Sequence, residues 1–166
     1  MTNKRKRRRV KRIQNGGLFM SKTYIHYGND HFDEEIFNNK KNNPRDNSFL
    51  NKPPYGLWGS PEKGDWTWKD FCEAENYRTS SFDKNFRFAL KDDAKIFVVR
   101  DRHDCLSYLK DTFLGGKKLD FDRIMDEYDG MELIHGKNYM DLHMEEFYSW
   151  DVDSIVIWNP QILQFL

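Results

Sequence analysis

The sequence lacks the patterns that mark several common classes of protein. No apolar run is long enough to span a bilayer and no secretory signal pattern is present, so we expect a cytoplasmic protein. No GxGxxG opens a helix after a strand, GxSxG is absent, and "LGGKK" fails the spacing of a phosphate-binding loop. These absences argue against a Rossmann dinucleotide-binding domain, an α/β-hydrolase and a P-loop enzyme.

Cysteine and histidine are scarce and dispersed. The two cysteines, Cys72 and Cys105, lie far apart and outside any CxxC pattern. We therefore interpret them as buried free thiols rather than as a disulfide or a metal site. The five histidines form neither HExxH nor a zinc-finger spacing, so we expect no bound metal ion.

Acidic residues are missing from the first 19 positions, where basic residues are concentrated. Residues 4–12 hold eight of the 27 lysines and arginines, which leaves 19 basic and 27 acidic side chains in the remainder, a net charge of −8. A basic arm on an acidic body can bind nucleic acid or act as a localisation signal. It can equally be a solvated, disordered tail.

A third interpretation is that residues 1–19 are a translation artefact. The codons for "NGGLFM" can contain GGAGG, a bacterial ribosome-binding sequence, a few bases before Met20. Translation would then begin at Met20, with "MSKTYIHYG". We accordingly predict a tail over residues 1–19, either disordered or artefactual, and a single domain over residues 20–166.

Length and composition favour one folded domain of mixed structure. A chain of 166 residues can bury a core, and an aromatic content of 16% argues against disorder. Alternating or β-branched apolar segments predict strands at residues 23–27, 56–60, 86–90, 94–100, 131–134 and 153–158. Helical periodicity predicts helices at residues 67–77, 104–113, 120–128 and 139–148, and residues 38–56 have the composition of a long polar loop. The predicted fold class is α+β.

Four polar residues occupy the predicted strands or their ends: His26, Ser60, Glu132 and Asp153. Each of them alone is expected to point to solvent, because side chains alternate between the two faces of a strand. Taken together they indicate a functional cleft, because neighbouring strands can bring such positions to one place.

Three motifs resemble the ADP-ribosyltransferase-like family, including its poly-ADP-ribose polymerase branch, and they follow in order over residues 23–165. "YIHYG" is similar to the HxG opening of that family. "GLWGSP" followed by "WKDFCEAENY" is similar to its second motif, a strand and then a helix that bounds the nicotinamide pocket. "WDVDSIVIWNPQIL" is similar to its last motif, in which an acidic residue leads a strand.

The resemblance implies a fold and a ligand. The fold would be a pair of split antiparallel β-sheets with flanking helices, which clasp NAD in a cleft. His26 would hydrogen-bond the ribose hydroxyls. The backbone of Tyr27 or Gly28 would pair with the nicotinamide carboxamide, and the missing side chain of Gly28 would let the ring come close.

The second and third motifs would complete the site. Trp58 or Phe71 would stack on the nicotinamide, and Ser60 would help to hold the ring or the ribose. Most members of the family carry a glutamate at the last motif, where this chain has Asp153. Asp153 would be the catalytic acid, and Glu132 is the second candidate for that role. Asp151 lies just before Asp153 and could equally cap a turn.

The chemistry of the reaction agrees with these residue types. Breaking the N-glycosidic bond creates a positively charged, oxocarbenium-like sugar, which a fixed carboxylate stabilises, and nicotinamide leaves without help from a metal. The resemblance therefore implies that the protein transfers ADP-ribose from NAD to a macromolecule, protein or nucleic acid, or hydrolyses NAD. A protein with this activity could be a toxin, a phage-encoded modifier or an anti-defence factor.

Two other functions fit the sequence. The first is a catalytically inactive binding protein on the same scaffold, which the missing glutamate favours. The second is a nucleic-acid-binding protein that uses the basic arm, against which the net charge of −8 on the body argues. We expect no association with a membrane in any of these cases.

Overall fold

The computed structural model describes residues 22–44, 51–112, 115–135 and 146–166. The strands are β1 (Tyr24–Tyr27), β2 (Leu57–Pro61), β3 (Asn85–Leu90), β4 (Ile96–Val99), β5 (Leu109–Asp111), β6 (Lys117–Leu119), β7 (Gly130–Leu133), β8 (Ser154–Ile157) and β9 (Leu163–Phe165). The helices are α1 (Glu34–Asn42), α2 (Trp68–Ala74), α3 (Arg102–Cys105) and α4 (Phe121–Glu127). The fold class is α+β, as predicted.

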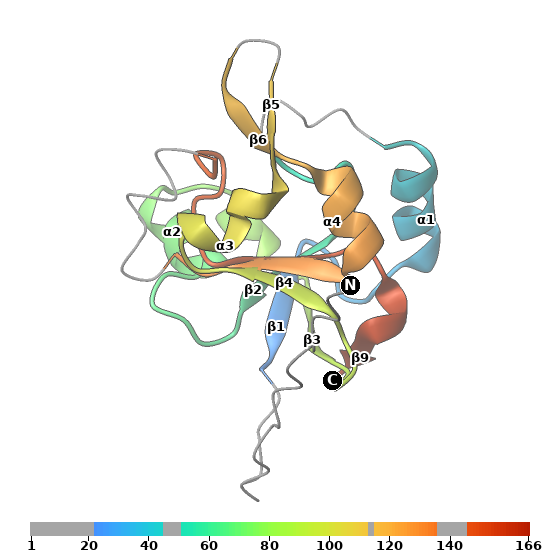
Figure 1. The fold of residues 1–166 in the computed structure, drawn as a ribbon. Coiled ribbons are helices and arrows are strands. Elements are labelled where there is room, and N and C mark those ends of the chain that lie inside the picture. The colour runs from blue at the N-terminus through green and yellow to red at the C-terminus, as the bar shows by residue number, and fades with distance from the viewer. Residues whose placement is uncertain (1–21, 45–50, 113–114, 136–145) are drawn as a thin grey trace, which may run out of the picture.

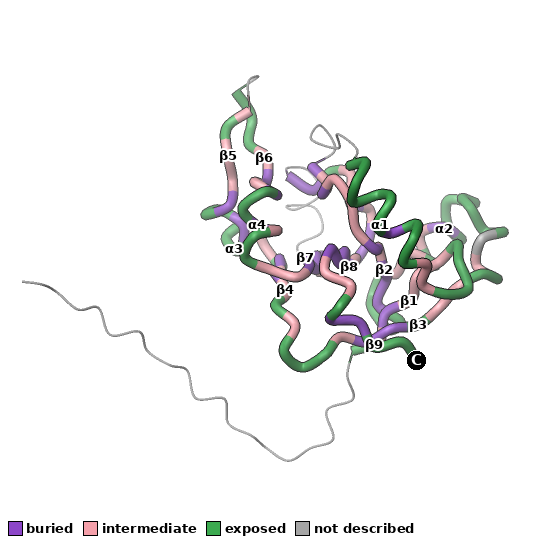
Figure 2. The backbone as a smooth tube through the Cα atoms, turned by 90° about the vertical axis from the view of Figure 1, so that its right-hand side faces the viewer, coloured by how far each residue is buried: buried purple, intermediate pink, exposed green. Residues whose placement is uncertain are grey.

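Seven of the strands form one curled sheet in the order β4-β7-β8-β2-β1-β3-β9 (Figure 1). β4 and β7 pair in parallel, and every other neighbouring pair in this sheet is antiparallel. The remaining strands, β5 and β6, form a hairpin that projects from the body (Figures 1 and 2). β1 and β2, which carry two of the predicted motifs, are therefore neighbours at the middle of the sheet.

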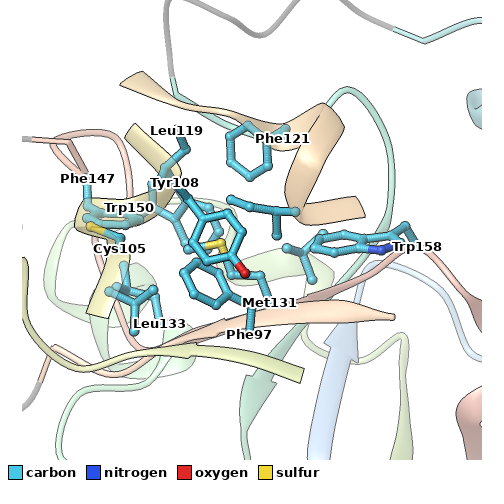
Figure 3. Packing of buried hydrophobic residues seen from close by; sticks show 13 residues of the cluster. Phe97, Cys105, Tyr108, Leu119, Phe121, Met131, Leu133, Phe147, Trp150 and Trp158 are labelled. Carbon is cyan, nitrogen blue, oxygen red and sulfur yellow. The ribbon is translucent and has the colours of Figure 1, made fainter. Parts of the chain in front are cut away.

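β8 is buried on both faces. Residues 155–158 alternate between two hydrophobic clusters, with Val156 and Trp158 in one and Ile155 and Ile157 in the other. Figure 3 shows the first cluster, which packs beneath α3, α4 and the base of the hairpin. A strand buried on both faces reads as a continuous apolar run rather than as an alternating one, which is the pattern of "SIVIW".

Most of the predicted elements are confirmed. Each of the six predicted strands overlaps an observed strand, and α4 lies within the predicted helix at residues 120–128. The helix predicted at residues 67–77 is shorter, but it begins as expected: the side chain of Thr67 accepts from the backbone of Asp70, and the carboxyl of Asp70 accepts from the backbone of Thr67. This reciprocal cap satisfies two backbone donors at the start of α2.

The helix predicted at residues 104–113 is wrong. Helix α3 ends at Cys105, a 3-10 turn follows, and Leu109 then starts strand β5, where it pairs with Leu119 of β6. Gly115, which precedes β6, has a φ of +83°, a backbone conformation that favours glycine, and its N–H donates to the carbonyl of Thr112 at 3.0 Å. The apolar spacing that suggested a helix is compatible with both structures, and the cross-strand pairing decides between them.

The polar loop predicted at residues 38–56 is shorter at its start, because residues 38–42 belong to α1. The signals for this helix were present. Asp33 caps it by accepting from the backbone N–H of Ile36 at 2.8 Å, acidic residues fill its first turn, and lysines fill its last. Phe37 is its buried contact with the body.

Two predictions fall largely or wholly outside the described residues: the tail over residues 1–19 and the helix at residues 139–148. Within the described part of the chain, no helix is both long enough and apolar enough to cross a membrane.

Candidate functional site

Strands β1 and β2 part in the middle of the sheet, and this opening positions the candidate site. Their last paired residues are Ile25 and Ser60. A continued register would place Tyr27 opposite Trp58. Instead, Nδ1 of His26 bonds the carbonyl oxygen of Trp58 at 2.7 Å, so the imidazole occupies the space between the two diverging strands.

The backbone of β1 alternates between its two neighbours, as in any antiparallel sheet. Toward β3, the N–H of Gly28 donates to the carbonyl of Lys84 at 2.7 Å. Toward β2, the carbonyl of Thr23 accepts from the N–H of Glu62 at 2.9 Å. Every second residue from Thr23 therefore turns toward β2, and the N–H and C=O of Tyr27 point into the opening that β2 leaves.

The hydrogen bond to Trp58 decides the tautomer of His26. A carbonyl oxygen only accepts, so Nδ1 carries the proton and Nε2 is the acceptor of the neutral ring. Burial lowers the pKa of His26 below its usual 6.5; the Trp58 carbonyl opposes this shift, and the charge of Lys40 adds to it. His26 is therefore neutral at pH 7, and its Nε2 is an acceptor nitrogen.

A cavity of about 330 Å³ lies at this opening. Four of the predicted binding residues line it: His26, Tyr27, Trp58 and Ser60. Trp68 of α2 contributes a further aromatic ring. The volume is at the lower end of the range for small-molecule sites, and the mixture of aromatic rings with a few polar groups is typical of them.

Ser60 connects the cavity to α2. Its Oγ accepts from the backbone N–H of Trp68 at 2.9 Å, at the first residue of the helix. This bond satisfies a donor that the helix itself leaves unpaired. Among the described residues, no acceptor takes the hydroxyl hydrogen of Ser60, and the bond to its oxygen holds Trp68 at the cavity wall.

Two tryptophans form another part of the cavity lining. The rings of Trp58 and Trp150 lie 4.8 Å apart, and Nε1 of Trp150 donates to the carbonyl of Asn51 at 3.1 Å. Nζ of Lys52 lies 5.5 Å from the centre of the Trp58 ring. Burial lowers the pKa of Lys52, and the negative charge of Asp151, which also lines the cavity, opposes this shift.

The two predicted carboxylates are held elsewhere. Oδ1 of Asp153, which is 7% exposed, accepts from the backbone N–H of His135 at 2.7 Å. Oε1 of Glu132 accepts from the hydroxyl of Tyr24 at 2.9 Å and contacts the ammonium of Lys22. Neither carboxyl is among the described residues that line the cavity. The structure thus brings four predicted binding residues together and separates both acids from them.

Gly28 and Phe71 also lie outside the cavity lining. Gly28 has a φ of +108°, and a Cβ added there would meet nothing within 4 Å. The position therefore needs glycine for its backbone conformation, and not because of a crowded neighbour. The ring of Phe71 stacks on Trp68 at 5.4 Å, so it supports a cavity residue from behind.

Sequence patterns missed a set of residues that the fold brings to this site: Lys52, Trp68, Trp150 and Asp151. Trp68, Trp150 and Asp151 lie within the quoted motifs, beside residues that were selected. Lys52 lies in the long polar segment and has no local signal. It reaches the site because Asn51 is bonded both to Trp150 and to the backbone N–H of Leu119, the latter at 2.8 Å.

Within the residues that the structure describes, no group of three or more His, Cys, Asp or Glu side chains is arranged to hold a metal ion. No protein-family model, no curated protein and no solved structure matches the chain. Its function has to be inferred from the geometry and chemistry of the cavity between β1 and β2.

Proposed function

We propose that the protein binds NAD in the cavity between β1 and β2 and breaks its nicotinamide–ribose bond, passing ADP-ribose to a macromolecule or to water. The observation that carries this proposal is the opening itself, where His26, the backbone of Tyr27, and Trp58 meet. The fold would then be an ADP-ribosyltransferase-like split sheet. β1, β3 and β9 would lie on one side of the split, and β2, β8, β7 and β4 on the other.

The backbone of Tyr27 suits the nicotinamide carboxamide. A carboxamide carries an acceptor oxygen and a donor NH₂ side by side. The N–H and C=O of one strand residue form the complementary pair, and those of Tyr27 point into the opening. Trp58 or Trp68 would stack on the nicotinamide ring, since aromatic rings favour offset stacking.

The remaining polar groups of the cavity suit the rest of the dinucleotide. Nε2 of His26 would accept from a ribose hydroxyl, and the hydroxyl of Ser60 would donate to the same sugar or to the carboxamide. Lys52 and Arg78 line the cavity, and their positive charges would balance the diphosphate.

Cleavage requires a group in the site that stabilises positive charge. The electron pair of the bond between C1′ and nitrogen moves onto the nicotinamide, which leaves as a neutral molecule, and positive charge develops on the ribose. A carboxylate stabilises that charge. Asp153 remains the acid that the motif resemblance proposes, with Glu132 second, and each would have to exchange its present hydrogen bonds for the sugar.

A second candidate function is a protein that binds the nucleotide without turning it over. One observation favours it: the two carboxyls that the motif resemblance offers, Asp153 and Glu132, do not line the cavity and are bonded to other partners. Binding would then use the same aromatic and cationic residues.

Two measurements on the full chain test the proposal. Nicotinamide release from NAD is followed with and without a cell lysate, and NAD binding is measured by calorimetric titration. Release that requires lysate indicates a macromolecular acceptor, and release without it indicates hydrolysis. Binding without release supports the second candidate, and the absence of both contradicts the two candidates.

A further inference from the structure

We propose that Asp151, on the segment that leads into β8, is the carboxylate that faces the reacting ribose; this inference rests on the proposed cleavage of NAD. Asp151 is the one acidic side chain among the described residues that line the cavity. It therefore shares the cavity with His26, Trp58 and Ser60, to which the motif resemblance assigns the ligand.

The start of β8 explains why the acid that faces the cavity is Asp151, in the segment before this strand, and not Asp153. Ser154, the first residue of β8, lines the cavity, whereas Asp153 contributes no lining atom. The carboxyl of Asp153 instead accepts from the buried N–H of His135, beyond the end of β7. Withdrawing the carboxyl would leave that buried backbone donor without this acceptor, which is unfavourable.

The neighbours of Asp151 hold its backbone in place. Trp150 and Val152 are each 2% exposed, and Asp151 between them is only partly buried. Trp150 is fixed by its bond to the carbonyl of Asn51 and by its contact with Phe147, whose ring centre lies 5.8 Å away. The backbone from which the side chain of Asp151 extends is therefore held by packed neighbours on both sides.

The charges around Asp151 suit a reaction that develops positive charge. Asp151 forms no ion pair within 4.0 Å with any described residue, so none of these residues neutralises its carboxylate by direct contact. Lys52, held over the ring of Trp58, attracts it from a greater distance. A diphosphate bound by Lys52 would weaken that attraction and leave Asp151 as the local counter-charge for the ribose.

The proposed step balances as follows. The bond between C1′ of the ribose and the nicotinamide nitrogen breaks, and its electron pair stays on the nicotinamide. The carboxylate of Asp151 stabilises the cationic ribose without forming a bond. An oxygen of water or of the acceptor then bonds to C1′ and loses its proton to solvent. No oxidant, reductant or metal is required.

Three variants of the full chain test this assignment: Asp151→Asn, which removes the charge and keeps the size, Asp153→Asn, and Asp126→Asn. Asp126 is an exposed residue of α4 and serves as the matched control. For each variant, nicotinamide release gives kcat and KM, calorimetry gives the Kd for NAD, and thermal unfolding shows whether the fold is kept.

We expect Asp151→Asn to lower kcat by about 100-fold or more, because one electrostatic partner of the transition state is lost. The Kd for NAD should stay close to that of the unaltered protein. Asp126→Asn should change neither.

Asp153→Asn separates the two acids. We expect it to lower the unfolding temperature, because it weakens the acceptor of the His135 N–H, and to lower kcat far less than Asp151→Asn does. The assignment is overturned if Asp153→Asn lowers kcat more than Asp151→Asn. It is also overturned if Asp151→Asn keeps full activity. If the protein binds NAD but releases no nicotinamide, both the assignment and the proposed cleavage are overturned. In that case the Asp151→Asn variant should still bind NAD.

Discussion

Nδ1 of His26 and the carbonyl oxygen of Trp58 meet at 2.7 Å, at the point where β1 leaves β2. The ring takes the place that a backbone N–H of β1 would have in a continued ladder, so the sheet opens and the Trp58 carbonyl keeps a partner. The same bond leaves Nε2 as an acceptor. One side chain thus stabilises the opening and serves the proposed ligand.

Replacing His26 by Ala should therefore affect both stability and binding. The carbonyl of Trp58 would lose its partner, which costs about 1–3 kcal/mol of unfolding free energy. The affinity for NAD should fall about tenfold, because one hydrogen bond to the ribose is lost. Urea unfolding and calorimetry measure the two effects. His103→Ala is the control, since the side chain of His103 is 89% exposed, and equal effects of the two variants would contradict the assignment.

The stability of the protein should depend on pH through His26. Its pKa is lowered by burial, so in a window below 6.5 the unfolded chain binds a proton that the folded protein does not. The unfolding free energy contributed by His26 is thus fully present above pH 6.5 and is lost as the pH falls through the folded pKa. The difference in unfolding free energy between pH 7.5 and pH 5.5 should be smaller in His26→Gln than in the unaltered protein. Identical differences would show that His26 does not titrate as described.

Asn51 is expected to stabilise the wall of the cavity that carries Trp150. Its amide donates to the carbonyl of Glu146 at 2.6 Å and accepts from the N–H of Leu119 at 2.8 Å, both buried. Asn51→Ala leaves both groups without this partner, and we expect it to lower the unfolding free energy by about 2–4 kcal/mol. Asn38→Ala, on an exposed face of α1, should change it by less than about 0.5 kcal/mol. Urea midpoints compare the two, and similar values would contradict the role of Asn51.

Ser60→Ala tests the link between the cavity and α2. Loss of the oxygen that accepts from Trp68 should cost about 0.5–2 kcal/mol, as for loss of a helix cap. The affinity for NAD should also fall, because Trp68 is held less firmly at the cavity wall. Thermal unfolding and calorimetry measure the two effects, with Ser107→Ala at an exposed position as the control. An unchanged affinity would show that Trp68 does not need this anchor.

Local residue patterns were enough to place the main elements. Strand β8 was recognised from a run of apolar, β-branched residues, and α2 from the helical periodicity of residues 67–77. The hairpin of β5 and β6 was missed, because Leu109 can lie on a helix or a strand and its pairing with Leu119 is a tertiary contact. Periodicity records only which residues are apolar, and not which partner buries them.

A local pattern was also enough to select His26 and Tyr27, because they are adjacent residues of β1 and so reach the same opening. The choice between Asp151 and Asp153 was beyond any local pattern. The segment before β8 is irregular, so no alternation rule says which of its carboxyls turns toward the cavity. The contacts of Trp150 and the backbone donor of His135 decide that orientation, and both depend on how distant segments pack.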